Sequence, residues 1–449
     1  MSDPLVNTGD RIRLHLDSLA AGGEAVGRHE GLAVFALWGC PGDEAEVEIT
    51  EVQQRFARGV VREVIAPSPD RVTAPCPHFG SCGGCQIQHI AYPAQLRHKT
   101  SIVRDALTRI GGLSEAEIGE TWGMDDPWHY RNRAEYHAQL DESGDLYLGF
   151  TRHHTHDVFA LRECALQHPL SEQVRLALLE LMPRLAQGPQ ERARLLDAEN
   201  LVSFASEQAL VTLVCDGRPP FVPQLADELM KVKGVAGVAA ARARGRLAGH
   251  RSPAETIAGD GHLVERLDGE GYRISPDSFF QVNPRQAARM VELVKEWSAV
   301  GRGDGVLDLY TGVGTFLLPL ARRAHHAAAV EESEAALADA RANLRRWRLN
   351  NVSLYEGRVE RALPRLAQRG WRSDVIVLDP PRKGCGPIVC ASAARLTPRR
   401  IILVSCHPAT LARDLKCLAE HGYLARKVQP VDMFPQTWHV EAVALCEKA

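Results

Sequence analysis

Hydrophobic and polar residues alternate at the start of the chain, as they do in strands that bury one face. Residues 9–16 alternate, and apolar runs follow at 32–36, 45–51 and 60–65, separated by glycine-rich turns and a Pro-Gly-Asp turn. Short strands spaced this closely predict a small β-barrel of the oligonucleotide-binding type over residues 1–68. An SH3-like or other small barrel without a role in nucleic-acid binding fits the same pattern.

The pattern changes near residue 266 to buried apolar strands that alternate with helical periodicity. Residues 305–310, 374–378 and 400–404 are apolar runs of strand length. This alternation predicts an α/β domain, doubly wound around a mostly parallel sheet, over residues 266–449. Between them, residues 69–265 mix helical and strand patterns and predict a central α+β domain.

Composition adds the class of protein. The 449 residues are 45% hydrophobic and 24% charged, which is ordinary for a soluble globular chain. No apolar run reaches membrane-spanning length, and the N-terminus lacks a basic and then apolar signal segment, so we expect a cytoplasmic protein without a membrane partner. Eleven cysteines in that setting indicate reduced thiols, a metal site or catalysis rather than disulfides.

The charge balance does not by itself indicate a nucleic-acid partner. The net charge is −3, and residues 1–75 carry seven Lys or Arg against twelve Asp or Glu. RNA would therefore bind through local basic patches. Residues 92–109 form a basic helical pattern that includes Lys99, and residues 130–136 set Arg131 and Arg133 between tyrosines, which suits RNA stacking and a solvated strand equally.

Three closely spaced cysteines indicate a metal site. Cys76, Cys82 and Cys85 follow a Cx5CxxC spacing with glycines between them, and Cys164 is the best candidate for a fourth ligand. Zinc accepts four thiolates as well. Because zinc loops usually separate the first pair by two to four residues, the five-residue gap favours an iron–sulfur cluster.

A glycine-rich turn after a buried strand predicts a nucleotide-type cofactor. Residues 305–310 form the strand, Gly312 and Gly314 form the turn, and Leu317 occupies the third glycine position of a dinucleotide fingerprint. A pyrophosphate is therefore disfavoured, whereas S-adenosylmethionine needs only the turn. Glu331 ends the next strand at the spacing expected of a carboxylate that binds ribose hydroxyls.

Further candidate residues end the later strands. Asp379 precedes two prolines that cannot continue a strand, which exposes its carboxylate at the sheet edge. Cys406 follows the apolar run 400–404 and precedes Pro408, a residue that suits the first position of a helix. The helix dipole there favours thiolate, so Cys406 is a candidate nucleophile. A second reading is a small buried hydrophobic residue.

Taken together, these motifs resemble the RNA (uracil-5)-methyltransferases, and specifically the ribosomal RNA enzymes with a TRAM domain and an iron–sulfur cluster. Residues 21–28 and 41–43 resemble a TRAM domain, and residues 281–283, 308–314, 379–382, 405–408 and 432–441 carry the rest of the resemblance. It implies a Rossmann-like class I methyltransferase domain, a 4Fe–4S cluster and 23S ribosomal RNA as partner. It also implies a pocket lined by Gln281, Tyr310, Thr315, Glu331 and Asp379, with Glu441 as the base.

The implied reaction begins with addition of the Cys406 thiolate to C6 of uracil, which makes C5 nucleophilic toward the methyl group. Glu441 then removes the C5 proton; on the residues alone, a charged residue on an edge strand is also possible. His407 departs from the family's usual asparagine. The alternatives are a transfer RNA T-loop uridine as substrate, or a non-catalytic RNA-binding assembly protein with a degenerate methyltransferase fold. No obligate protein partner is implied.

Overall fold

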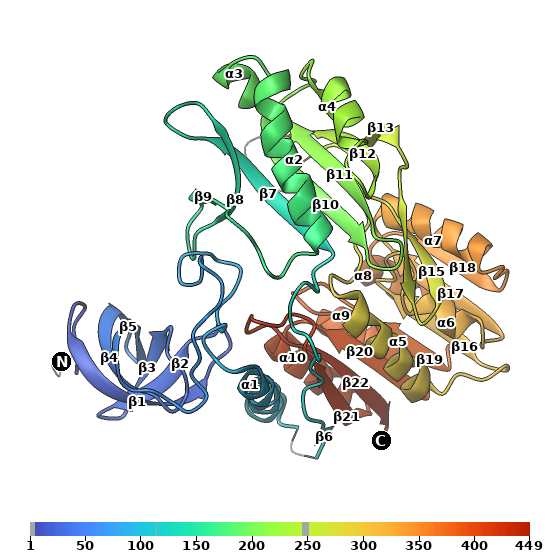
Figure 1. The fold of residues 1–449 in the computed structure, drawn as a ribbon. Coiled ribbons are helices and arrows are strands. Elements are labelled where there is room, and N and C mark those ends of the chain that lie inside the picture. Colours follow the sequence, from blue (N-terminus) through green and yellow to red (C-terminus); the bar gives the residue numbers. More distant parts are fainter. Residues whose placement is uncertain (1–4, 114, 245–250) are drawn as a thin grey trace.

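The alternating N-terminal segment closes into a barrel in the computed structural model, which describes residues 5–113, 115–244 and 251–449 (Figure 1). Apolar side chains such as Leu14, Leu16 and Val47 point inward, which explains the alternation. In the order β1-β2-β3-β5-β4, the strands are β1 (Arg11–Leu19), β2 (Ala25–His29), β3 (Leu32–Leu37), β4 (Glu44–Val52) and β5 (Phe56–Ala66).

A buried ion pair joins the barrel to the segment that follows it. The Asp43 side chain is fully buried and accepts a hydrogen bond of 2.6 Å from Arg71 Nη2. The same carboxylate also accepts from the backbone N–H groups of Cys40 and Ser68. The linker that follows the barrel, residues 67–71, is thus fastened to it.

The central region is built on a mixed sheet with the order β13-β12-β11-β10-β7-β8-β9. Helices α2 (Pro169–Leu185) and α4 (Val222–Leu229) contact each other and pack on this sheet; the short α3 spans Pro189–Arg192. The strands are β7 (Arg133–Leu140), β8 (Leu146–Thr151), β9 (Val158–Ala160), β10 (Leu195–Ser203), β11 (Gln208–Cys215), β12 (Val235–Arg242) and β13 (Glu255–Gly259).

The C-terminal region has the predicted α/β architecture. Its sheet has the order β18-β17-β16-β19-β20-β22-β21-β6, parallel from β18 to β20 and antiparallel at β22. The strands are β16 (Gly305–Leu309), β17 (His326–Glu331), β18 (Val352–Glu356), β19 (Val375–Leu378), β20 (Arg400–Ser405), β21 (Tyr423–Val431) and β22 (Glu441–Lys448).

Helices cover both faces of this sheet, as its continuous apolar strands require. One face packs against α5 (Pro284–Ser298), α6 (Leu317–Ala321) and the end of α7 (Glu334–Arg346). The other packs against α8 (Val359–Gln368), α9 (Gly386–Arg395) and α10 (Pro408–Glu420). The strand, turn and helix predicted around residues 305–323 are present.

Part of the predicted central domain belongs with the C-terminal sheet by its contacts. Helix α1 (Tyr92–Ala106) and the π-helical turn η1 (Leu107–Gly111) pack on α10, and β6 (Glu117–Ile118) pairs with β21. The predicted boundary between residues 265 and 266 falls inside β14 (Leu263–Leu267), which forms a hairpin with β15 (Glu270–Ile274). Sequence patterns could not reveal this, because chain order does not determine which sheet a short strand joins.

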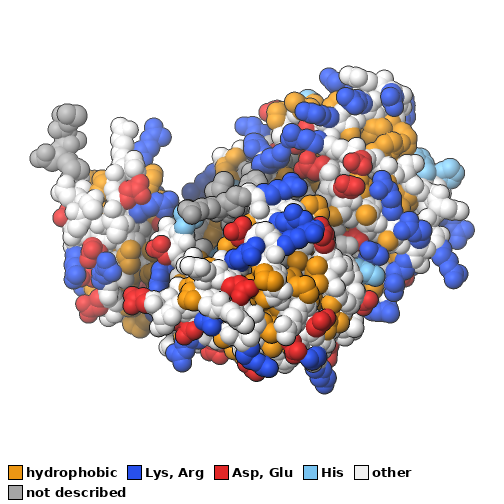
Figure 2. Space-filling model, turned by 90° about the horizontal axis from the view of Figure 1, so that it is seen from above, with side chains coloured by type: hydrophobic (Ala, Val, Ile, Leu, Met, Phe, Trp, Pro, Cys, Tyr) orange, Lys and Arg blue, Asp and Glu red, His pale blue; other side chains and the backbone are white. Residues whose placement is uncertain are grey.

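In the view from above, basic and acidic side chains are both spread over the larger part of the molecule and over the barrel lobe (Figure 2). Within the described ranges, no helix has the length and apolar character needed to cross a membrane.

Candidate active site

Cys406 lies directly after β20, at the carboxyl end of the sheet. His407 is the N-cap of α10 and its Nδ1 accepts a hydrogen bond of 3.4 Å from the Thr410 N–H, while Pro408 begins the helix. Burial, together with smaller contributions from the nearby carboxylates of Glu441 and Asp379, raises the pKa of the Cys406 thiol to about 11. The thiolate expected from the helix dipole is therefore not favoured in the free protein.

Glu441 lies opposite Cys406 because of the strand register. β20 and β22 are antiparallel with Ser405 paired to Ala442, so the next position sets Cys406 across from Glu441. The Glu441 side chain is buried, at 3% exposure. Burial raises the pKa of this carboxyl well above its usual range, and the charge of Asp379 raises it further.

Asp379 is the first residue after β19, the strand beside β20. Gln281 Nε2 donates to Asp379 Oδ2 at 3.2 Å, and Gln281 is itself held through its carbonyl by Asn132 Nδ2 at 3.1 Å. Burial raises the pKa of Asp379 to about 7, and Asp308 contributes to the increase. The predicted pair of Gln281 and Asp379 is therefore in contact.

Arg382 supplies positive charge to this site, and it was not among the site residues predicted from the sequence. It lowers the pKa values of Cys406 and Glu441, opposing burial in both cases. Its Nη2 lies 3.3 Å from His439 Nε2, and burial together with the Arg382 charge lowers the pKa of His439 to about 3. The sequence signal that could have found Arg382 is its position three residues after Asp379, in the segment that follows β19.

The glycine-rich turn lies two strands from Cys406. Gly312 and Gly314 have φ of +55° and +94°, a backbone conformation that favours glycine, and a Cβ at Gly312 would meet only open space. Tyr310 also has positive φ, and its hydroxyl is buried without a hydrogen-bond partner. Thr315 follows the turn and is 8% exposed.

Two carboxylates organise this turn. Glu331 Oε2 accepts from the Gly312 N–H at 2.9 Å, and Oε1 accepts from the backbone of Glu332 and Ser333 at 2.9 Å each. Burial raises the pKa of Asp308 to about 7, and one of its oxygens has no hydrogen-bond partner. Unsatisfied buried groups at a turn of this kind suit a polar ligand.

The predicted residues thus follow the sheet edge in strand order. Glu331 ends β17, Asp308 lies near the end of β16, Asp379 follows β19, and Cys406 follows β20. Glu441 begins β22 beside them. Two surface cavities, of about 290 and 180 Å³, lie along α5 instead and include none of these residues.

Comparisons with known proteins identify the family. The sequence profile of the tRNA (uracil-5-)-methyltransferases matches residues 91–449, and that of the TRAM domain matches residues 6–61. Proteins named as uncharacterized RNA methyltransferases are 37% identical in Thermosynechococcus vestitus (97% of this chain, 98% of the relative) and 35% identical in Halalkalibacterium halodurans (98% of each). The chain belongs to the tRNA (uracil-5-)-methyltransferase family.

A solved structure supports the same assignment over nearly the whole methyltransferase chain. The tRNA (uracil-54, C5)-methyltransferase of Pyrococcus abyssi, in complex with S-adenosyl-L-homocysteine, is 26% identical with a TM-score of 0.75. The match covers 97% of this chain and 100% of the other. The predicted family, the TRAM barrel and the class I methyltransferase fold are confirmed.

The four cysteines predicted as cluster ligands, Cys76, Cys82, Cys85 and Cys164, lie near one another, although they are not arranged as a closed metal site. The Gly84 N–H donates to Cys82 Sγ at 3.3 Å, and Cys85 and Cys164 share one apolar cluster. Cys76 and Cys82 are close enough to raise the pKa of Cys164, although burial has the larger effect. Among the residues that the structure describes, no group of three or more His, Cys, Asp or Glu is arranged to hold a metal ion.

Of the two readings of residues 130–136, the RNA-stacking one is wrong. Tyr130 and Tyr136 are 1% and 0% exposed, so neither can stack on a base, and Arg133 donates to the backbone carbonyls of Pro276 and Ser278. Asn283, in the segment 281–283 that carries part of the family resemblance, caps α5 by accepting from the Gln286 N–H at 3.3 Å. These side chains hold elements together, a role that polar patterns in a sequence do not distinguish from binding.

Proposed function

We propose that this family member transfers a methyl group from S-adenosylmethionine to C5 of a uridine in 23S ribosomal RNA, through a covalent adduct on Cys406. The observation that supports it most is the register of β20 and β22, which sets Cys406 opposite Glu441 beside Asp379 and Gln281. Its test is to locate 5-methyluridine after incubation of separate ribosomal and transfer RNA preparations with the enzyme. Ribosomal RNA is expected to gain 5-methyluridine, and a Cys406→Ala variant is expected to give none.

The first step is addition of Cys406 Sγ to C6 of uracil. The thiol proton passes to Asp379, a nearby carboxyl with a pKa of about 7, and the sulfur electron pair forms the bond to C6. The electrons of the C5–C6 double bond move toward O4, where an enolate develops. Arg382 favours the thiolate by its charge.

S-adenosylmethionine, when bound, supplies an electrophilic methyl group that C5 takes up. The residues present fit such a ligand: the Gly312–Gly314 turn leaves open space, and Tyr310 and Asp308 each present a buried oxygen without a partner. Glu331 shapes the turn through its bond to the Gly312 N–H and keeps lone pairs for a ribose hydroxyl.

Glu441 completes the reaction as the base. It removes the proton from C5, the electrons of that C–H bond re-form the C5–C6 double bond, and the bond from C6 to Cys406 Sγ breaks. A buried carboxylate with a raised pKa is a stronger base once ionised, which suits this step. The thiolate then regains its proton from Asp379.

A transfer RNA substrate is the second candidate function. It is favoured by the Pyrococcus abyssi relative, which is named for uracil-54 of transfer RNA and matches 97% of this chain. The same digestion experiment separates the two: 5-methyluridine in the T loop, with none in 23S ribosomal RNA, would replace the first proposal with this one.

We also propose that Cys76, Cys82, Cys85 and Cys164 hold an iron–sulfur cluster. Support comes from their neighbouring positions and from the N–H of Gly84 directed at Cys82 Sγ, a bond that stabilises a ligating sulfur. Anaerobic purification should yield about four iron atoms per chain, and Cys164→Ser should lose them. Cys417→Ser, on α10, is the matched control that keeps its iron. Zinc without iron would overturn the assignment.

A further inference from the structure

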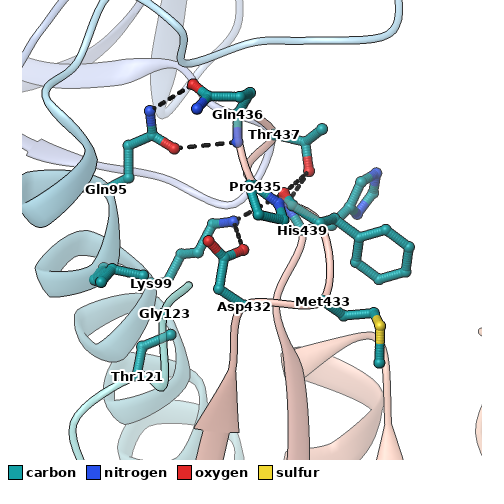
Figure 3. Close-up of polar contacts among 12 residues, drawn as sticks. Gln95, Lys99, Thr121, Gly123, Asp432, Met433, Pro435, Gln436, Thr437 and His439 are labelled. Atoms are coloured by element: carbon teal, nitrogen blue, oxygen red, sulfur yellow. Dashed lines mark hydrogen bonds and ion pairs between the residues drawn. The ribbon is translucent and has the colours of Figure 1, made fainter. Parts of the chain in front are cut away.

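Lys99 is buried instead of lying on the basic helical surface that its sequence neighbours suggest. Its side chain is 0% exposed, as is that of Asp432, and Lys99 Nζ donates to Asp432 Oδ1 at 2.5 Å (Figure 3). It also donates to the carbonyl of Phe434 at 3.0 Å. Lys99 therefore fastens α1 to the loop of residues 432–440, called the terminal loop below.

Gln95, one helical turn earlier on α1, makes a second connection to the terminal loop. Its Nε2 donates to Gln436 Oε1 at 2.9 Å, and its Oε1 accepts from the Gln436 N–H at 3.1 Å (Figure 3). Gln436 has a φ of +71°, a conformation that costs energy for a residue other than glycine. The paired amides thus hold the middle of the loop in a shape that it would not adopt alone.

The terminal loop determines where Glu441 lies. It connects β21 to β22, and Glu441 is paired across that hairpin with Val431, the residue directly before Asp432. Lys99 therefore holds the loop one residue from the register partner of Glu441. Lys99 contacts Asp432 and Phe434 of the loop, so it acts on the base through the backbone of the hairpin.

The cysteine-containing segment joins the same connection. The Ile87 N–H, two residues after Cys85, donates to the Gln436 carbonyl at 3.2 Å, and Gln95 Nε2 also donates to the Ile87 carbonyl at 3.1 Å. Tyr130, which packs beside Cys85, donates from its hydroxyl to the Pro435 carbonyl at 3.0 Å. Three separate segments thus converge on the terminal loop.

We propose that Lys99 and Gln95 are positioning residues that aim Glu441 at C5 of the RNA adduct, so that α1 and the cysteine segment control proton removal. This inference rests on the proposed function, in which Glu441 takes the C5 proton. Loss of either connection lets the terminal loop relax and displaces the base, while Cys406 after β20 and the cofactor turn after β16 stay in place. Methyl transfer to C5 continues, and release of the methylated RNA slows.

The experiment separates those two steps in the full-length enzyme. Two variants weaken the connections without leaving a buried charge unpaired: Gln95→Met, and the double variant Lys99→Met with Asp432→Asn. A single turnover with RNA and methyl-labelled S-adenosylmethionine measures label bound covalently to protein and label in free RNA. Glu441→Gln is the reference for loss of the base, and Ser101→Ala, exposed on the same helix, is the matched control.

Both connection variants should transfer methyl within about threefold of the wild-type rate and release product at least about tenfold more slowly, so that labelled adduct accumulates as in Glu441→Gln. Ser101→Ala should release product normally. The refuting result is sought in a connection variant that retains the wild-type melting temperature. If methyl transfer and product release slow equally in it, or neither slows, Lys99 and Gln95 do not position the base. Absence of 5-methyluridine from the wild-type enzyme would instead refute the proposed function, so the two failures are distinguishable.

Discussion

Cys406 is held as a neutral thiol in the free enzyme by burial and by two neighbouring carboxylates. Because these raise its pKa to about 11, the thiolate fraction at neutral pH is small and rises about tenfold per pH unit up to that value. Alkylation of the Cys406 peptide by iodoacetamide, followed by mass spectrometry from pH 7 to pH 10, should rise about a thousandfold. A plateau below pH 9 would show that the helix start dominates over burial.

The positive charge of Arg382 opposes both burial and the two carboxylates, because it lowers the pKa of Cys406. Its removal should therefore make the thiol measurably less reactive. Replacement by methionine removes a positive charge that lowers the pKa of Cys406, so alkylation at a fixed pH should slow by about threefold to tenfold. Arg382→Lys keeps the charge and is the matched control. Equal alkylation rates in the wild type and Arg382→Met would exclude the guanidinium as the local cation.

At the residue scale, the sequence predicted those side chains whose position follows from a strand end. Asp379 and Cys406 each follow an apolar run, so their place at the sheet edge could be predicted without coordinates, whereas the role of Glu441 was implied only by the family resemblance. Arg382 and Lys99 could not be chosen in this way. Lys99 binds Asp432, which lies 333 positions further along the chain, and Arg382 lies beside His439, 57 positions further on, so neither role follows from the local pattern.

At the scale of elements, the buried ion pair of Asp43 and Arg71 attaches the barrel to the linker that follows it. Asp43 directly precedes β4, and Arg71 lies in the linker. Burial acts to raise the pKa of Asp43, but hydrogen bonds from Arg71, Ser68 and Cys40 hold it below its usual value of 3.8. Because the folded pKa is depressed, its stabilisation is present above pH 3.8 and is lost as pH falls through the folded pKa.

Asp43→Asn should therefore destabilise the barrel by about 3 kcal/mol at neutral pH, since it leaves Arg71 partly buried without its partner. Denaturant unfolding monitored at the barrel is the measurement. The difference from wild type should shrink in acid. The matched control is Asp17→Asn, an exposed replacement on β1, which should change stability little. A similar loss of stability in both variants would show that the Asp43–Arg71 pair does not stabilise the barrel.

Helices and strands were predicted well where hydrophobic periodicity is strong. They were predicted poorly where contacts with distant parts of the chain decide which element they pack against. The barrel strands and the strands at 305–309, 375–378 and 400–405 follow from buried faces. Neither the short β6 nor the packing of α1 on α10 could be predicted from hydrophobic periodicity. Two residues are too few to show a strand pattern, and a polar helix surface does not reveal which helix it contacts.

At the scale of the whole molecule, the sheet edge unites residues from five strands, and the rest of the chain supports it. The TRAM barrel, the cysteine segment and α1 all reach the terminal loop side of that edge: a Cβ on barrel residue Gly23 would lie 2.7 Å from Gln86 Cβ and 3.5 Å from Trp438 Cβ. Family membership follows from matches over nearly the whole length. The identity of the RNA does not, since it depends on surfaces that recognise a folded partner.

The central claim is that Cys406 forms a bond to the pyrimidine ring which Glu441 must help to break. RNA in which the target uridine is replaced by 5-fluorouridine tests it most directly, because fluorine at C5 cannot leave as a proton does. We predict a denaturation-resistant complex of enzyme and methylated RNA that forms only with S-adenosylmethionine and maps to Cys406. An active preparation that methylates ordinary RNA but yields no such complex, or one attached to another residue, would contradict the account.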